Sequence, residues 1–317
     1  SKTSTIPLHH NGTAHHMTAP TLAHSTDFGR MYSRRRGGTP EVPSITTIIG
    51  ALNQEMGWWE AKCAVDAAFP YLERLIAVRD SGDWRKEREA KDWLRDAATR
   101  DRDDAAVRGD FVHNYAEQFA LRTIGRATDA DVDHHLGLCR QAGVESYLPA
   151  FHAFWETFSP RVVDAEATLW NAEVGYAGTT DLLCEIVTPS GPVRAVLDWK
   201  TKRTLYKRNG ERKDKDLQPY TGMQLAAAAM ASEVWVPNEA DTSQDRWEPF
   251  TFAPEVGLAV GIAPDGYVVR QYDVYAPLVW DSFVALRQAW SFLAEGALMM
   301  GPALSGPGDV RRGTPRP

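Results

Sequence analysis

The stretch that decides the fold reads Val196-Leu197-Asp198-Trp199-Lys200-Thr201, an apolar strand that ends with an acid and a lysine two residues apart. Side chains alternate between the two faces of a strand, so Asp198 and Lys200 share one face and Trp199 lies on the other. An acid and a lysine on one face are also common at solvated strand ends. The pair therefore indicates a catalytic site only in combination with other residues of the chain.

A second carboxylate precedes this strand. The segment Gly175-Tyr176-Ala177-Gly178-Thr179-Thr180-Asp181 places Asp181 seventeen residues before Asp198. Its glycines relieve a turn at the start of a strand, so we expect Asp181 beside Asp198 on neighbouring strands. Two close carboxylates repel each other unless a divalent cation lies between them, and oxygen ligands suit magnesium or manganese. The alternative is that Asp181 only caps a turn.

A third group of polar residues lies in the segment 108–117, which reads as a helix. His113 and Glu117 are four residues apart and share a helix face with Asp110. A lone histidine in such a helix usually packs against its neighbours. A zinc hydrolase that uses His113 and Glu117 is a further alternative, but no third nitrogen or sulfur ligand is evident and the strand with Asp198 would be unexplained.

Together these three elements resemble the RecB-like exonucleases of the PD-(D/E)xK superfamily, which bacteriophages often carry. The ordered signature is Arg-Gly-x-x-x-His-x-x-x-Glu, then Gly-x-x-Asp, then an apolar strand that ends in Asp-x-Lys-Thr. The opening Pro43-Ser44-Ile45-Thr46-Thr47-Ile48 and the tryptophan-rich segment after it also look similar to phage members. The resemblance therefore covers roughly residues 40–235.

The resemblance implies the roles of the candidate site residues. It implies a Mg²⁺ or Mn²⁺ cofactor and the catalytic set Asp181, Asp198, Lys200 and Gln224, in which Lys200 is the catalytic lysine. His113, Asp181 and Asp198 would bind the metal with help from the Trp199 carbonyl. Glu117 and Glu166 are expected to lie behind these ligands and to support them.

Two departures from the family pattern concern the glutamine and the cysteines. Ala228 stands where family members often carry a tyrosine four residues after Gln224, and Tyr220, one helical turn earlier, is the alternative. The iron-sulfur branch of the family has four cysteines, whereas this chain has only three, Cys63, Cys139 and Cys184. No iron-sulfur cluster and no disulfide framework are expected.

The resemblance implies an α/β fold with a restriction-endonuclease-like core, a small mixed central sheet flanked by helices, and a helical N-terminal subdomain. The sequence divides accordingly, because a Ser-, Thr- and His-rich start lacks periodicity, the period becomes two after Pro160, and the end is rich in Gly and Pro. We expect a flexible arm over 1–40, a helical subdomain with the His-bearing helix over 41–160, a nuclease core over 161–300 and a disordered tail over 301–317.

Local patterns predict individual elements within this division. A Ser44 N-cap is expected to open a helix, and a further helix is expected to begin at Trp58. Strands are predicted near 166–173, 181–187 and 193–198, a hairpin turn at 263–266, and helices near 144–158, 219–232 and 277–299.

The charge distribution bears on DNA. The formal net charge of −7 excludes a protein that coats nucleic acid indiscriminately. The segment 200–216 nevertheless holds eight Lys or Arg against three acids and directly follows the candidate catalytic strand. A solvated loop is the alternative to a phosphate-binding loop. The predicted DNA-binding residues are Arg108, Lys202, Arg203, Lys207, Arg208, Arg212 and Lys213, with the arginine run 34–36 as an additional candidate.

These features predict a metal-dependent DNA exonuclease that hydrolyses phosphodiester bonds in phage DNA replication, recombination or end processing. An endonuclease of the same fold and a catalytically silent DNA-binding subunit remain alternatives. Besides DNA, a phage recombination or single-strand-binding protein is a candidate partner. No apolar run is long enough to cross a bilayer, so we expect no membrane partner and a cytoplasmic location in an infected bacterial host.

Overall fold

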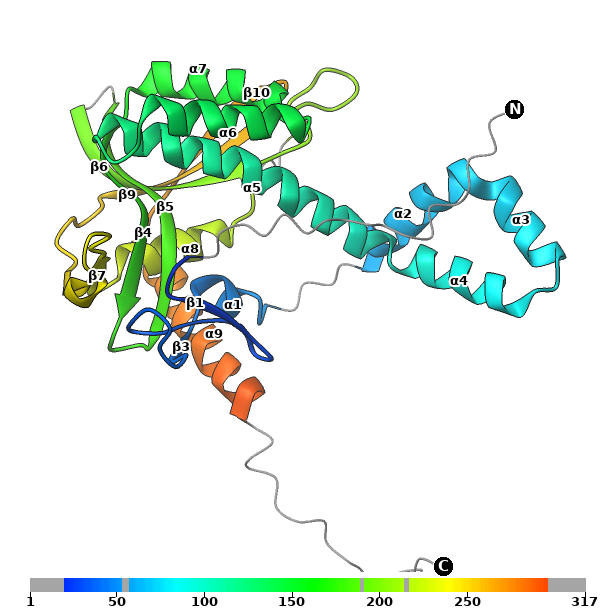
Figure 1. Cartoon of the computed structure of the whole chain (residues 1–317), viewed down its shortest axis with the longest axis horizontal. Coiled ribbons are helices and arrows are strands. Elements are labelled where there is room, and N and C mark those ends of the chain that lie inside the picture. Colours follow the sequence, from blue (N-terminus) through cyan, green and yellow to red (C-terminus); the bar gives the residue numbers. More distant parts are fainter. Residues whose placement is uncertain (1–19, 53–56, 189–190, 214–216, 296–317) are drawn as a thin grey trace, which may run out of the picture.

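The computed structural model describes residues 20–52, 57–188, 191–213 and 217–295 of the 317-residue chain. A seven-stranded mixed sheet lies at its centre, with helices on both faces (Figure 1). The strand order is β10-β9-β6-β5-β4-β7-β8, and only the β6–β9 pair is parallel. The fold is therefore a mixed α/β fold, as expected.

The middle of the sheet is an antiparallel meander of β4 (Arg161–Asn171), β5 (Tyr176–Thr188) and β6 (Gly191–Thr201). Its strands alternate apolar and polar residues over their outer parts and become buried on both faces where helices cover them. The chain returns to the sheet as β9 (Val256–Ala263) and β10 (Gly266–Tyr272), which form the predicted hairpin.

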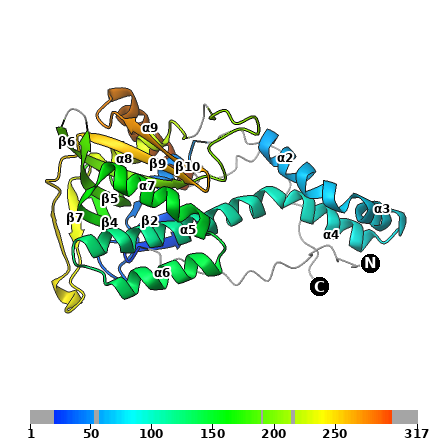
Figure 2. The same ribbon diagram turned by 90° about the horizontal axis from the view of Figure 1, so that it is seen from above.

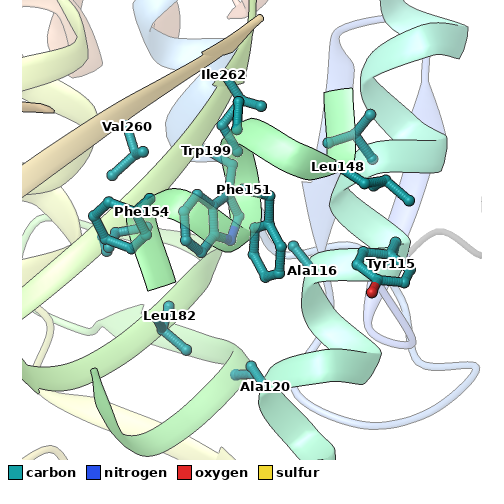
Figure 3. Packing of buried hydrophobic residues seen from close by; sticks show 14 of the residues in the cluster. Tyr115, Ala116, Ala120, Leu148, Phe151, Phe154, Leu182, Trp199, Val260 and Ile262 are labelled. Carbon is teal, nitrogen blue, oxygen red and sulfur yellow. The ribbon is translucent and has the colours of Figure 1, made fainter. Parts of the chain in front are cut away.

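One face of the sheet is covered by α5 (Ala97–Thr123), α6 (Asp129–Gln141), the 3-10 turn η2 (Glu145–Tyr147) and α7 (Leu148–Phe158). Trp199 is 2% exposed and lies on this face between Phe151 and Phe154, at ring-centroid distances of 5.4 and 5.3 Å (Figure 3). Burial of these rings is the main stabilising contribution that joins the helices to the sheet. The boundary expected at residue 160 therefore does not separate two cores, because helices before it and strands after it share one.

The opposite face carries α8 (Thr221–Ala229), α1 (Ile45–Ile49) and α9 (Pro277–Glu295). The alanine-rich α8 lies close to the sheet, since its small side chains leave room for Leu225 to pack against Gly257 of β9. The predicted Ser44 N-cap is confirmed, because the Ser44 side chain accepts a hydrogen bond from the Thr47 backbone N–H.

The prediction of a flexible N-terminal segment over 1–40 is wrong for residues 23–32. These residues form β1 (Ala23–Thr26) and β2 (Gly29–Tyr32), which pair with β3 (Val42–Pro43) in a small second sheet. Leu22 and Tyr32 are 0% and 1% exposed and pack with Trp170, Ala177 and Trp235 of the central sheet. This apolar burial holds the segment against the body. Residues 1–19 lie outside the described residues.

Four helical segments form an arm at the far end of α5 (Figures 1 and 2). They are α2 (Gly57–Ala68), the 3-10 turn η1 (Phe69–Tyr71), α3 (Leu72–Asp80) and α4 (Trp84–Arg95). Asp83 caps α4 by accepting a hydrogen bond from the Arg85 N–H. The helix predicted from Trp58 is thus present, and it lies away from the sheet.

Two short strands at one end of the sheet and one short turn lack a clear sequence signal. They are β7 (Glu233–Val236), β8 (Arg246–Pro249) and the 3-10 turn η3 (Thr242–Gln244). The sequence predicted a small sheet, whereas these two strands extend the sheet to seven strands. In the described residues no helix is both long and apolar enough to span a membrane. The tail expected over 301–317 lies outside the described residues.

Candidate active site

A cavity of about 440 Å³ opens between α5, the middle of the sheet, α8 and the N-terminal segment. Most of the predicted site residues line it, together with residues that the sequence did not single out. The predicted ones are His113, Glu117, Glu166, Asp181, Asp198, Lys200 and Gln224. The cavity therefore gathers residues that lie more than a hundred positions apart in the chain.

Asp181 and Asp198 face each other across β5 and β6, as expected. Leu182 pairs with Leu197, so the antiparallel register places Asp181, which precedes Leu182, beside Asp198, which follows Leu197. Asp181 Oδ2 accepts a 2.7 Å hydrogen bond from the Trp199 backbone N–H, which fixes its orientation. Asp198 is only 4% exposed, and burial raises its pKa although the nearby Lys200 ammonium opposes the change.

Lys200 and Gln224 hold the Asp198 carboxylate from two sides. Lys200 Nζ lies 2.6 Å from Asp198 Oδ2, so the two side chains form an ion pair. Gln224 donates from Nε2 to Asp198 Oδ1 at 2.6 Å and accepts from Lys200 Nζ at 3.2 Å. Burial alone would lower the pKa of Lys200, but Asp198 and Asp181 outweigh it and raise that pKa, so the amine is protonated at neutral pH.

Glu166 extends this row of acids to a third strand. The pairs Ala165–Leu182 and Ala167–Thr180 bracket it and place it opposite Asp181. Its backbone adopts φ 52°, a left-handed conformation that is uncommon for a residue with a Cβ atom. Burial, with the charges of Asp181 and Glu117, raises the pKa of Glu166 well above its ordinary value. Three neighbouring strands thus each direct one carboxylate into the cavity.

Helix α5 adds His113 and Glu117, which are one turn apart on the same helix face. His113 Nδ1 lies 3.7 Å from Asp181 Oδ2, beyond hydrogen-bond distance. Burial and the Asp181 charge raise the pKa of Glu117 to about 7. A Cβ atom on Gly109 would come within 3.3 Å of Thr201 Oγ1, so the glycine lets the helix approach the end of β6 closely.

Gly178 has a comparable role on β5. A Cβ atom there would lie 2.5 Å from Ile45 Cδ1, so only glycine allows α1 to pack directly against this strand. The same contact sets Ser44 and Thr46 at the cavity wall. Both glycines of the motifs that the sequence singled out therefore position elements around the cavity.

The sequence did not identify the cavity residues of the N-terminal segment. Arg30 and Tyr32 of β2 line the cavity, and the Tyr32 hydroxyl lies 3.0 Å from Thr179 Oγ1. Burial raises the pKa of Glu166 and that of Asp110, and the Arg30 charge opposes this rise in both. The only signal for β2 was a four-residue alternation next to a glycine, too short to distinguish a strand from a loop.

Several predicted residues lie outside the cavity. Trp199 does not line the cavity. Its backbone N–H donates a hydrogen bond to Asp181, and its side chain lies on the opposite face of the sheet. Arg108 and the described part of the basic segment beyond Lys200 also lie outside it. Arg34 and Arg36 of the arginine run are used in packing, over Trp170 and Trp235 at 4.0 and 5.0 Å.

The basic segment folds back on itself between β6 and α8. Lys207 N–H donates to the Glu211 carbonyl and Lys213 N–H to the Leu205 carbonyl. Arg203 forms an ion pair with Asp101 of α5, and Lys213 Nζ donates to the Thr204 carbonyl at 3.1 Å. Lys207, Arg208 and Arg212 are exposed. The expected basic loop is thus present, and Arg203, Arg212 and Lys213 each contact other groups of the protein. Residues 214–216 lie outside the described residues.

The donor set of the cavity fits a hard divalent cation. Among the described residues no three His, Cys, Asp or Glu side chains are gathered closely enough to hold a metal ion, and the Lys200 ammonium lies against Asp198. The carboxylates of Asp181, Asp198 and Glu117 and the imidazole of His113 nevertheless line one cavity. Carboxylate oxygens with one imidazole suit Mg²⁺ or Mn²⁺.

Comparisons with known proteins add no family assignment. No family model and no curated protein matches the chain. A solved structure described as "Crystal structure of SSO0001" is similar with 18% sequence identity and a TM-score of 0.28, covering 56% of this chain and 71% of the other. A likeness at that TM-score carries no argument about fold or function.

Proposed function

We propose that this protein is a Mg²⁺- or Mn²⁺-dependent DNA exonuclease with a restriction-endonuclease-like core. The observation that supports it best is the meeting of Asp181, Asp198, Lys200 and Gln224 in one cavity, where Lys200 and Gln224 both contact the Asp198 carboxylate. These are the residues for which the sequence resembles RecB-like nucleases. The phage DNA recombination setting and the host cytoplasm are part of the proposal and rest on that resemblance alone.

Asp181 and Asp198 would hold the cation, with His113 as a third ligand and the Trp199 carbonyl as a fourth. Glu117 and Glu166 would support these ligands from α5 and β4. A bound divalent cation would supply a water of lowered pKa and neutralise charge on the phosphate. Because the pKa of Glu117 is about 7, this side chain is partly protonated at neutral pH, which reduces the mutual repulsion of the acids; burial raises the pKa of Glu166 as well.

Lys200 and Gln224 would act on the reacting groups. Lys200 keeps its proton at neutral pH, so its ammonium can orient the water and offset the charge that develops on the phosphate. Gln224 bridges Asp198 and Lys200 and holds the two at a fixed separation. Lys207, Arg208 and Arg212 are exposed on the loop that follows β6, where they would bind the phosphate backbone.

Digestion of end-labelled linear DNA and covalently closed circular DNA tests this function. We expect release of label from linear DNA with magnesium or manganese, no release in excess chelator, and intact circles. Activity that persists in chelator would exclude the metal-dependent mechanism. Cleavage of circular DNA would identify an endonuclease, and binding of DNA with no cleavage of either form would identify a silent subunit.

A further inference from the structure

The basic loop after β6, residues 202–213, carries an exposed aromatic ring. Tyr206 is 41% exposed. The loop around it holds six Lys or Arg against one Glu, so the ring lies within a cationic surface. Cations beside an exposed aromatic ring are the combination that binds single-stranded nucleic acid, because the phosphates meet the charges and the bases stack on the ring.

Hydrogen bonds hold this loop as a short hairpin attached to the sheet. Tyr206 pairs with Arg212 in an antiparallel bridge. The Leu205 N–H donates to the Asp265 carboxylate at 3.0 Å, and the Leu205 side chain is 1% exposed. Neighbouring side chains of an extended segment point to opposite sides, so burial of Leu205 turns Tyr206 outward. The ring is therefore held in place before a ligand arrives, which lowers the entropic cost of binding.

The hairpin begins directly after the candidate active site. Lys200 lines the cavity, and Tyr206 follows it by six residues, which span at most about 20 Å of extended chain. Phosphates of one DNA strand lie about 3.4 Å apart along the helix axis, so Tyr206 lies within about six nucleotides of a phosphate at Lys200. The loop projects from the body beside β10, where Arg212 Nη2 lies 3.5 Å from the Tyr267 carbonyl oxygen (Figure 1). A strand with one phosphate in the cavity can therefore extend over the hairpin.

The aromatic ring distinguishes between two kinds of DNA. Inside a duplex each base is stacked between its neighbours, so a protein meets phosphates and the edges of bases in the grooves. In a single strand or an overhang the faces of the bases are accessible to an aromatic side chain. The cations of the loop would bind the phosphates of either form, whereas Tyr206 can stack only on an unpaired base.

We propose that Tyr206 stacks on an unpaired base of the DNA strand that enters the active site. The substrate is then single-stranded DNA or the single-stranded end of a duplex. Lys207, Arg208 and Arg212, exposed on the same hairpin, bind the phosphates near that base. This inference rests on the proposed function and adds to it the class of substrate.

Equilibrium binding in calcium tests the proposal, with one oligonucleotide used as a single strand and as a blunt duplex with G·C ends. Tyr206→Ala should weaken binding of the single strand about 5-fold or more, because stacking of one base on an aromatic ring contributes at least that much. Binding of the blunt duplex should be unchanged. Tyr206→Phe keeps the ring and should bind both forms like the unaltered chain. Tyr275→Ala is the matched control, since Tyr275 is 49% exposed outside the loop, and it should leave both affinities unchanged.

A series of single strands with one abasic nucleotide at successive positions locates the stacked base. At one position the abasic nucleotide should weaken binding by the unaltered chain, and there Tyr206→Ala should cause no further loss, because both changes remove the same contact. An unaltered single-strand affinity of Tyr206→Ala, or an equal loss on the blunt duplex, would overturn the proposal. Cleavage by the unaltered chain in magnesium is measured separately. Absence of cleavage would refute the nuclease function, whereas the binding measurements decide the role of Tyr206.

Discussion

At the scale of single residues, Asp198 and Lys200 form one ion pair but have different proposed tasks. Asp198→Asn and Asp181→Asn should each abolish divalent binding and cleavage together, because an amide lacks the charge that stabilises the ion. Lys200→Ala should keep metal and DNA binding while the single-turnover rate falls by about two or more orders of magnitude. Calcium titration measures binding, and single-turnover digestion measures the rate.

Loss of the ion pair could also disturb the fold, so Lys200→Arg is included. It keeps the positive charge next to Asp198 but cannot place a compact ammonium at the same point, so we expect normal stability with reduced turnover. If Lys200→Ala cuts DNA at nearly the unaltered rate, Lys200 has no chemical task and the nuclease assignment is wrong.

Glu117 provides a pH-dependent stability test. Its folded-state pKa is about 7 against an ordinary value of 4.5, so the folded state binds the proton more tightly than the unfolded chain. The resulting stability is fully present below pH 4.5 and is lost as the pH rises through 7. Glu117→Gln should therefore be more stable than the unaltered chain at pH 8, by up to about 3 kcal/mol.

Urea unfolding in chelator at pH 5 and pH 8 measures this difference. We expect the advantage of Glu117→Gln to be small at pH 5, where most of the carboxylate in the folded protein is protonated, and larger at pH 8. Equal curves at both pH values would mean that Glu117 is well solvated. The same measurement on Glu173→Gln, a carboxyl in the turn between β4 and β5 and outside the cavity, controls for a general effect of charge removal.

At the scale of elements, the contact between β5 and α1 depends on one glycine. Gly178→Ala should destabilise the protein by about 1–3 kcal/mol, because the new Cβ atom would lie 2.5 Å from Ile45 Cδ1. Ile45→Ala removes the clashing atoms, so the double variant should lose less stability than the sum of the two single variants. Chemical unfolding of all four proteins gives this coupling.

Gly137 is the matched control for that substitution. It lies within α6, and no atom lies within 4 Å of a Cβ atom placed on it. Gly137→Ala should therefore stabilise the protein by about 0.4–1 kcal/mol, since alanine restricts the unfolded chain and favours the helix. Equal losses at positions 137 and 178 would show that the Ile45 contact does not decide the outcome.

The basic loop after β6 is the element proposed to bind DNA. Replacing Lys207, Arg208 and Arg212 by Ala should weaken binding and lower the slope of log affinity against log salt by about one for each lost phosphate contact. Calcium binding should stay unchanged. Arg203→Ala is an informative comparison. Its ion pair with Asp101 directs Arg203 towards α5, whereas Lys207 pairs with Glu211 inside the loop, so Arg203 should contribute less. An unaltered affinity and slope in the triple variant would exclude this loop as a DNA contact.

At the scale of the whole molecule, the sequence predicted those helices and strands that a short-range pattern of residues determines. The strand with Asp198, its neighbour with Asp181 and the helix with His113 were found from spacing, and the structure brings all three into one cavity. Hairpin 263–266 and the helix from Pro277 were found in the same way. The motif residues were predictable because each motif lies within a single strand or helix, where spacing alone decides which side chains share a face.

What the sequence missed depends on contacts between distant segments. The outer strands β7 and β8 are four residues each, too short for a period to be recognised. They exist because β4 offers an edge to β7, which in turn pairs with β8. Arg30 and Tyr32 reach the cavity only because Leu22 and Tyr32 bury themselves against Trp170 and Trp235. The boundary at residue 160 failed because the helical face of the core is completed by strands that follow it.

The docking of the N-terminal segment leads to a test of the whole arrangement. Leu22 is fully buried among side chains of the central sheet, so Leu22→Ala leaves a cavity there and should lower the free energy of unfolding by about 2–5 kcal/mol. Phe28→Ala is the control, because Phe28 lies in the same segment but is 53% exposed, and it should change stability by less than about 0.5 kcal/mol. Both are measured by urea unfolding. If Leu22→Ala were as harmless as Phe28→Ala, the segment would not be docked, and Arg30 and Tyr32 would not form a wall of the cavity.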